Sequence, residues 1–178
     1  MRAAHSDMGG CQGGFSIMEI LISIVVIAIG LLGLAGLQTK MVGVELEAYQ
    51  RSHALILLDD IMNRIRADEA SARAGAYDAL PGDCTTPGTT AAANMCAWLN
   101  AIQGVSGGEE VGSLIGGQGC VESIGIAPKT LRVTVAWQGL TPTAAPEAGI
   151  TCGADDYGDE AMRRVVSGVV VILPEEEE

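Results

Sequence analysis

The sequence predicts an α+β protein in which one long N-terminal helix precedes a small antiparallel β-sheet domain. The first indication is a run of 18 residues, from Ile20 to Leu37, that contains no charged residue. The second is a helical pattern that continues beyond this run, with no proline before Pro81. The third is a set of β-branched segments, separated by glycine and proline clusters, in the second half of the chain.

The composition limits the chain to one modest domain besides a membrane segment. It has 178 residues, and its 10 Lys and Arg residues stand against 22 Asp and Glu residues, giving a formal net charge of −12. Because the few cations are not clustered, the backbone of a nucleic acid would be repelled, so we expect no nucleic-acid partner. The closing residues Glu175 to Glu178 are expected to form a solvated acidic tail.

The apolar run is long enough to cross a membrane, since a helix of this length measures roughly 27 Å at about 1.5 Å per residue. A helical stripe then continues at steps of three and four residues. The pattern predicts one helix from about Phe15 to Ala74, whose second half packs under the sheet domain. The residues of the stripe are Met41, Val44, Ala48, Ser52, Leu55, Leu58, Met62 and Ile65.

Three glycines, Gly30, Gly33 and Gly36, interrupt the apolar run at three-residue spacing. Each weakens a helix by about 1 kcal/mol relative to alanine, and small side chains also let another helix approach closely. We therefore hold two interpretations open: a soft segment that stretches or unwinds during assembly, and simple packing against another membrane helix.

The pattern in the second half of the chain predicts an antiparallel sheet with one short helix. Three strands are expected, over Cys120 to Ala127, Thr130 to Trp137 and Val165 to Leu173. A short helix is expected over Ala97 to Ile102, with Trp98 as a core anchor rather than a binding residue.

Four cysteines, Cys84, Cys96, Cys120 and Cys152, follow the predicted long helix, and an even number outside the cytoplasm predicts two disulfides. Three pairings are possible. We favour the sequential one, Cys84 with Cys96 and Cys120 with Cys152, because short loops then bracket the strands without crossing them. A zinc site is disfavoured, since no Cys-x-x-Cys spacing occurs and the histidines are distant.

No arrangement typical of catalysis is visible, so we expect no enzymatic activity and no cofactor. His53 follows Arg51 and Ser52 on the long helix, where a surface or interface setting is expected. The glycine-rich stretch from Gly116 to Gly119 is not followed by Lys-Ser or Lys-Thr, as a phosphate-binding loop would require.

Glu19 is the unusual residue, because a carboxylate at the edge of an apolar membrane segment costs a few kcal/mol unless it is paired or reaches water. Cleavage of the Gly14–Phe15 bond would create an α-amino group on Phe15, four residues before Glu19. That cation can satisfy the carboxylate within one subunit or between neighbours. The alternative is that Glu19 sits at the headgroup level of an ordinary single-span anchor.

The stretch Gly14-Phe15-Ser16-Ile17-Met18-Glu19, followed at once by the apolar run, resembles the signal of type IV prepilins and pseudopilins. The resemblance implies a pilin-like fold and a prepilin peptidase that cuts after Gly14 and methylates Phe15. It also places Glu19 at the family's acidic position. Two features depart from the family pattern: Ile17-Met18 replaces Leu-Ile, and Arg2 is the leader's single cation, so orientation is weakly encoded.

Three further stretches, Gly30 to Gln38, Arg51 to Ala54 and Asp60 to Ala67, resemble the minor pilins called PilV, or type IV pilus modification proteins. The resemblance covers roughly residues 13 to 78. It implies a non-enzymatic subunit that joins other minor and major pilins at the inner membrane, in contact with lipid, and helps to prime the filament. Related pseudopilins can carry calcium, and Asp155, Asp156, Asp159 and Glu160 offer oxygen atoms. Their spacing is not that of a calcium loop, so we expect an acidic turn and no metal.

The resulting division is a cleaved leader (1–14), a membrane or filament-core helix (15–37), its amphipathic continuation (38–74), a disulfide-containing periplasmic head (75–173) and an acidic tail (174–178). The N-terminus is expected in the cytoplasm before the subunit moves into a pilus at the cell surface. Two alternatives stay open: a minor pseudopilin of a type II secretion system, and a single-span periplasmic binding protein that never polymerises.

Overall fold

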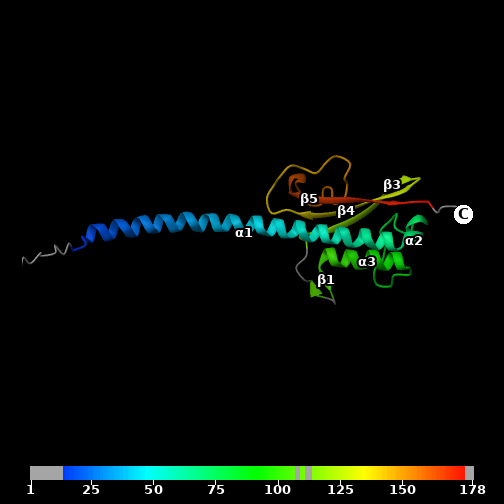
Figure 1. Ribbon diagram of the computed structural model, residues 1–178, viewed down its shortest axis with the longest axis horizontal. Coiled ribbons are helices and arrows are strands. Elements are labelled where there is room, and N and C mark those ends of the chain that lie inside the picture. Colours follow the sequence, from blue (N-terminus) through cyan, green and yellow to red (C-terminus); the bar gives the residue numbers. More distant parts are fainter. Residues whose placement is uncertain (1–13, 107–108, 111–113, 175–178) are drawn as a thin grey trace, which may run out of the picture. The chain divides into compact units, whose positions relative to one another are not determined.

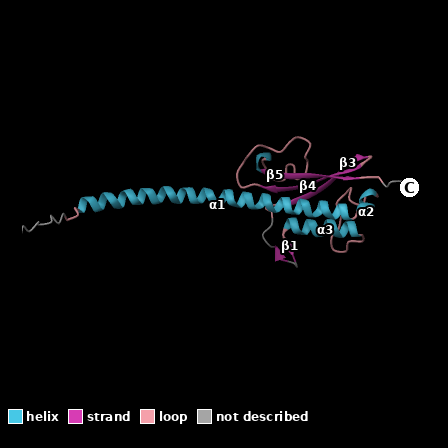
Figure 2. Cartoon of the chain, in the orientation of Figure 1, coloured by secondary structure: helices cyan, strands magenta, loops and turns pink. Residues whose placement is uncertain are grey.

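The computed structural model describes residues 14–106, 109–110 and 114–174 (Figure 1). The chain divides into two compact units, one that ends at Val42 and one that begins at Gly43. Helix α1, Ile17–Ala67, contributes its first part to one unit and its second part to the other. The second unit is an α+β domain of helices and an antiparallel sheet (Figure 2), as the sequence predicts.

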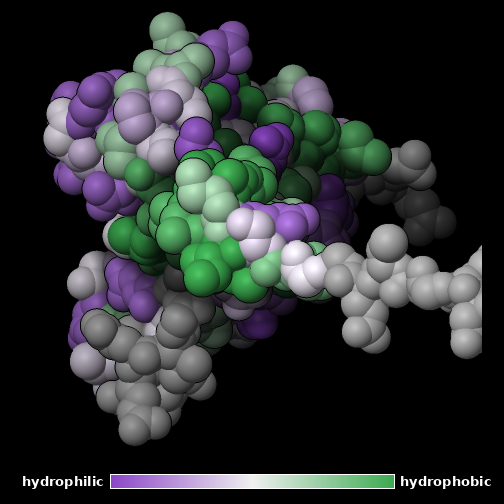
Figure 3. Space-filling model, turned by 90° about the vertical axis from the view of Figure 1, so that its left-hand side faces the viewer, coloured by the Kyte–Doolittle hydropathy of each residue, from purple (hydrophilic) through white to green (hydrophobic). Residues whose placement is uncertain are grey.

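In the first unit, every described residue is exposed. Hydrophobic side chains of this part of α1 face outward, as the space-filling view shows (Figure 3). An apolar helix without internal packing needs lipid or other helices around it, because its side chains otherwise contact water.

In the second unit, α1 buries one face against the domain, but this face differs from the predicted stripe. Leu58 and Ile65 are buried as expected, whereas Leu55 is 48% exposed and Ser52 is also exposed. The predicted buried face was therefore rotated by part of a turn from the observed one. The prediction followed the spacing of mainly apolar residues and left out Gln50, a polar residue that is buried. The buried residues of the helix are Gln50, Ala54, Leu57, Leu58, Ile61 and Ile65.

The helix ends at Ala67 rather than at Ala74, which corrects the predicted length. Asp68 leaves helical geometry, with φ −113° and ψ 51°, and a separate short helix α2 follows over Glu69–Arg73. The Asp68 carboxylate accepts a hydrogen bond from the Tyr77 hydroxyl at 3.1 Å. Because the Asp68 side chain is held by a residue beyond the helix, the backbone can leave helical geometry at this position.

The sheet has three antiparallel strands in the order β3-β4-β5, and the three predicted strands are confirmed. They are β3 Gln118–Ile126, β4 Lys129–Gln138 and β5 Arg163–Ile172. Val133 pairs with Val121 on one side and with Gly168 on the other, which places all three on one face. A shift in register between Ser123 and Gly125 puts a bulge in β3.

Two elements differ from expectation. Helix α3 covers Thr90–Gln103, starting seven residues before the predicted Ala97. Its N-terminus is capped by the Thr89 side chain, which accepts the Ala92 N–H at 3.1 Å. A two-stranded ribbon, β1 Val105–Ser106 with β2 Glu109–Glu110, was not predicted from the sequence.

The core lies between the sheet and the helices α1 and α3. Gly168 on β5 faces Leu58 and Met62 of α1, and Gly119 on β3 lies against the ring of Trp98 on α3. Trp98 is fully buried, so the prediction of a core anchor is confirmed. The long connection between β4 and β5 covers part of the opposite face of the sheet, where Gly153 approaches Ala136.

Candidate functional site

The Gly14–Phe15 bond lies in non-helical chain directly before α1. Ser16 begins the helix: its carbonyl accepts the Glu19 N–H at 3.0 Å, and its hydroxyl accepts the Met18 N–H at 3.4 Å. Phe15 is 81% exposed. A protease that needs an extended substrate can therefore reach this bond without unwinding a helix. Arg2 and Cys11 of the predicted leader lie outside the described residues.

Glu19 lies in the first turn of α1, where the partial positive charge of the helix N-terminus favours a carboxylate. Its side chain is exposed and forms no ion pair within the described ranges of the chain. The carboxylate is therefore available to a cation that this single chain does not supply.

The apolar part of α1 meets the length and composition of a membrane span, with a mean hydropathy of 2.9 over its best 18-residue window. Two hydroxyl groups near its ends bond within the helix: Ser23 donates to the Glu19 carbonyl at 2.7 Å, and Thr39 donates to the Ala35 carbonyl at 3.2 Å. Internal bonds of this kind satisfy polar side chains where water is absent.

Gly30, Gly33 and Gly36 all lie inside α1, which is continuous through them. A Cβ atom at any of the three would meet nothing within 4 Å. The glycines therefore leave an open surface on the helix, and both interpretations of their role stay predictions.

Two disulfides, Cys84–Cys96 and Cys120–Cys152, join the cysteines in the sequential pairing. The first ties α3 to the segment that precedes it. The second ties β3 to the connection between β4 and β5. Both are typical of an oxidising compartment.

The acidic residues of that connection have structural partners. Glu160 bonds Arg163 and accepts the Asp155 N–H at 3.0 Å, while Asp156 accepts a hydrogen bond from Gln118 at 2.9 Å. The hydrogen bond from Arg163 is the main reason why the pKa of Glu160 lies below its ordinary value. Within the described part of the chain, no three His, Cys, Asp or Glu side chains are grouped to hold a metal ion.

Tyr157 fixes the same connection to the start of β3. Its hydroxyl donates to the Gly116 carbonyl at 2.8 Å, and its ring lies against Gly116 and Gly153, which both have positive φ. Burial raises the pKa of Tyr157 to about 12, with a further contribution from the charge of Asp156.

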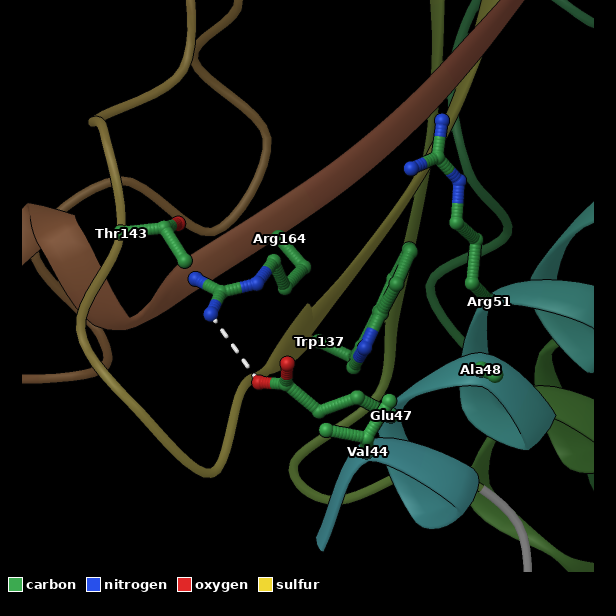
Figure 4. Close-up of a pocket in the computed structure, with 7 residues that line it drawn as sticks. All are labelled: Val44, Glu47, Ala48, Arg51, Trp137, Thr143 and Arg164. Carbon is green, nitrogen blue, oxygen red and sulfur yellow. Dashed lines mark hydrogen bonds and ion pairs between the residues drawn. The ribbon is translucent and has the colours of Figure 1, made fainter. Parts of the chain in front are cut away.

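A cavity of about 450 Å³ opens between α1, the end of β4 and the start of β5 (Figure 4). Glu47 closes one side, because its Oε1 accepts hydrogen bonds from the Leu140 N–H and from Arg164, both at 3.1 Å. Arg51 and Trp137 form the other side. Sequence reasoning missed this site, since residues 117 positions apart carry no common spacing signal.

His53 is half-buried on α1 and stacks on Tyr49, with ring centroids 6.0 Å apart. Its Nδ1 is buried without a hydrogen-bond partner in the described structure. His53 is therefore partly covered, and the predicted surface or interface role stays a prediction.

Comparisons with protein-family models, with curated proteins and with solved structures gave no match for this chain. The support for a function therefore comes from the residues of this chain and from their geometry.

Proposed function

We propose that this chain is a minor pilin of a type IV pilus. In this proposal the chain is inserted in the inner membrane, cut after Gly14 by a prepilin peptidase, methylated on Phe15 and assembled into the filament through α1. The observation that carries it is a combination of three features: an exposed, non-helical Gly14–Phe15 junction, a Glu19 in the next helical turn with no ion pair to any described residue, and an apolar first part of α1 that is exposed throughout.

The charges of the new Phe15 α-amino group and of the Glu19 carboxylate explain why these features belong together. A new α-amino group on Phe15 would sit at the positive end of a helix dipole, where a cation is disfavoured. A carboxylate at Glu19, four residues on, offsets that cost, within one chain or from a neighbouring subunit. Since both charges lie beside an apolar segment, leaving either one unpaired would cost a few kcal/mol. Assembly is therefore the step at which the pairing matters most.

The second unit suits a head domain outside the cytoplasm. Its two disulfides form under oxidising conditions, and the one candidate membrane helix among the described residues suits a single-pass topology with a periplasmic head. Partners in this proposal are the prepilin peptidase, other minor and major pilins, and lipid of the inner membrane. A minor pseudopilin of a type II secretion system would use the same features.

Replacing Glu19 tests the proposal in cells that make the filaments. We expect Glu19→Gln to enter the membrane normally but to disappear from filaments sheared off the cells. Glu45→Gln, an exposed carboxylate further along the same helix, is the matched control and should be incorporated like the wild type. Equal incorporation of Glu19→Gln and the wild type would remove the pairing role, and absence of the wild type from sheared filaments would overturn the proposal.

A further inference from the structure

The cavity between α1, the end of β4 and the start of β5 is large enough for a small organic molecule (Figure 4). Its volume of about 450 Å³ falls within the range of about 300–1,000 Å³ that is usual for ligand pockets. All of its described lining residues belong to the second unit, which begins at Gly43. The cavity is therefore a feature of that unit alone.

The charged side chains of this cavity leave one positive charge in excess. Among its described lining residues, two guanidinium groups, Arg51 and Arg164, stand against one carboxylate, Glu47. Arg164 is engaged by this carboxylate at 3.1 Å, and it also donates to the carbonyl groups of Thr141 and Ala161. The exposed side chain of Arg51 forms no ion pair or hydrogen bond with any residue that the structure describes. In a chain with a formal net charge of −12, such a cation beside a cavity favours an anionic ligand.

The carboxylate of the cavity is already taken, so a cationic ligand would find no partner in it. The Glu47 Oε1 atom accepts hydrogen bonds from the Leu140 N–H and from Arg164, both at 3.1 Å, and from the Thr141 hydroxyl at 3.4 Å. A ligand cation would have to compete with these three donors for the same carboxylate. The charges of the cavity therefore select against cations as well as favouring anions.

An apolar surface lies beside the unpaired cation. Trp137 on β4 is only 3% exposed, so the domain holds its indole ring in place, whereas Val44 on α1 is 69% exposed. Ala48, one turn beyond Val44, has only a methyl group, which leaves the cavity open at this point. An apolar group that packed against these side chains would be removed from water, which is favourable. An inorganic anion alone would leave this surface uncovered.

The cation and the apolar surface can be reached by one molecule. Val44, Ala48 and Arg51 follow one another at steps of four and three residues, which places them on one face of α1. The close-up shows Arg51 on the Trp137 side of the cavity, away from the pair formed by Glu47 and Arg164 (Figure 4). A guanidinium group can bond a carboxylate through two parallel N–H···O contacts, so it can also orient the ligand.

We propose that this cavity binds an organic acid that joins one carboxylate to an apolar or aromatic group. The carboxylate bonds Arg51, and the apolar group packs against Trp137 and Val44. Two sources supply this chemistry: a free small acid, and the C-terminus of a peptide whose last residue is apolar. The proposal goes beyond the filament function and does not rest on it, because the site lies within the second unit.

Calorimetric titration of the full chain in a non-ionic detergent tests this proposal, with phenylacetate as the probe and with the heat of titrating detergent alone subtracted. We expect phenylacetate to bind. Phenylacetamide has nearly the same shape without the charge, and it should bind at least about tenfold more weakly because a charged hydrogen bond is lost. Acetate lacks the apolar group and should also bind at least about tenfold more weakly. No binding of phenylacetate, or equal binding of either analogue, would overturn the proposal.

Replacing Arg51 tests its role in binding, and folding should not depend on this exposed side chain without a described partner. We expect Arg51→Gln to weaken the binding of phenylacetate about tenfold or more and to leave the binding of phenylacetamide unchanged. Arg66→Gln, at an exposed arginine further along α1, is the matched control and should bind phenylacetate like the wild type. Wild-type affinity in Arg51→Gln would refute the site.

A second variant fills the cavity instead of changing its charge. Ala48→Phe places a ring where the ligand would lie, and we expect it to lose phenylacetate binding while both disulfides still form. Ala101→Phe, at an exposed alanine on α3, is the matched control and should keep the binding. Undiminished binding in Ala48→Phe would place the ligand elsewhere and overturn the proposal.

A tripeptide of two glycines and a C-terminal phenylalanine separates the two sources. Tighter binding of this peptide than of phenylacetate would identify a peptide C-terminus as the ligand, and weaker binding would identify a free small acid. The same peptide with an amidated C-terminus lacks the carboxylate and should bind at least about tenfold more weakly than the free peptide. Equal affinities of the free and amidated peptides would count against recognition of a carboxylate and would overturn the proposal.

Discussion

Arg164 on β5 and Glu47 on α1 form an ion pair of 3.1 Å across 117 positions of the chain. The same Glu47 oxygen accepts the Leu140 N–H, so one carboxylate ties the helix, the last strand and the connection between β4 and β5 together. This contact fixes where the helix enters the domain.

Removing this carboxylate should destabilise the domain. We expect Glu47→Ala to lower the free energy of unfolding by about 1–3 kcal/mol, because hydrogen bonds from a charged group and from a backbone N–H are lost together. Chemical denaturation of the full chain in detergent, followed by tryptophan fluorescence, measures the change; Trp137 beside the cavity and the buried Trp98 both contribute to the signal. Glu45→Ala, at an exposed position on the same helix, should leave stability unchanged, and equal effects of the two variants would contradict this role for Glu47.

The two disulfides should contribute unequally, because the loops that they close differ in length. Cys120–Cys152 spans 32 residues and Cys84–Cys96 spans 12. A chain-entropy estimate gives about 4 kcal/mol for the longer loop and about 3 kcal/mol for the shorter one. Paired Cys→Ser variants, compared by denaturation, should preserve this order. Greater loss on removing the shorter loop would contradict the entropic account.

Gly119 should tolerate no side chain, since a Cβ atom there would lie 2.6 Å from the ring of Trp98. We expect Gly119→Ala to cost about 1–3 kcal/mol, because a fully buried indole has no room to move. Gly82→Ala is the control, since a Cβ atom there meets nothing within 4 Å. Equal denaturation midpoints for the two variants would argue against close packing of α3 on β3.

The raised pKa of Tyr157 leads us to expect that the folded domain loses stability at alkaline pH. Its pKa in the folded state is raised to about 12 from the ordinary value of 10.0, so the folded state holds the phenolic proton more tightly than the unfolded state. The stabilisation is therefore complete below pH 10 and is lost as pH rises toward 12. Denaturation midpoints of the wild type should fall more steeply over this range than those of Tyr157→Phe, and parallel slopes would contradict it.

The lowered pKa of Glu160 leads us to expect a loss of stability at acidic pH. Its pKa is lowered, chiefly by the hydrogen bond from Arg163, so its contribution is present above pH 4.5 and is lost as pH falls below that value. Glu160→Gln should therefore flatten the acid limb of the stability curve. An unchanged acid limb would mean that Arg163 does not hold this carboxylate in solution.

The sequence predicted the elements that have a strong local signal. The apolar run, the three strands and the buried Trp98 follow from hydropathy and alternation, and the structure has them. The length of α3 was underestimated because its first turns are rich in alanine, which does not distinguish a buried helix face from an exposed one. The capping residue Thr89 alone was too weak a signal to place the start of the helix. The end of α1 was misplaced because Asp68 leaves the helix where Tyr77 bonds it, a contact that sequence periodicity does not contain.

The candidate sites also differ in whether a local sequence pattern could indicate them. Gly14, Phe15 and Glu19 lie close together along the chain, so their spacing alone is enough to propose a joint role, which stays a prediction. The Glu47–Arg164 contact depends on tertiary packing, because it joins residues 117 positions apart.

The mass of the first mature residue tests the central claim most directly. Protein purified from its native membrane and digested should give an N-terminal peptide that begins at Phe15 and carries one added methyl group. A peptide that still begins at Met1, in cells that contain an active prepilin peptidase, would leave Glu19 without its cation and would contradict the account.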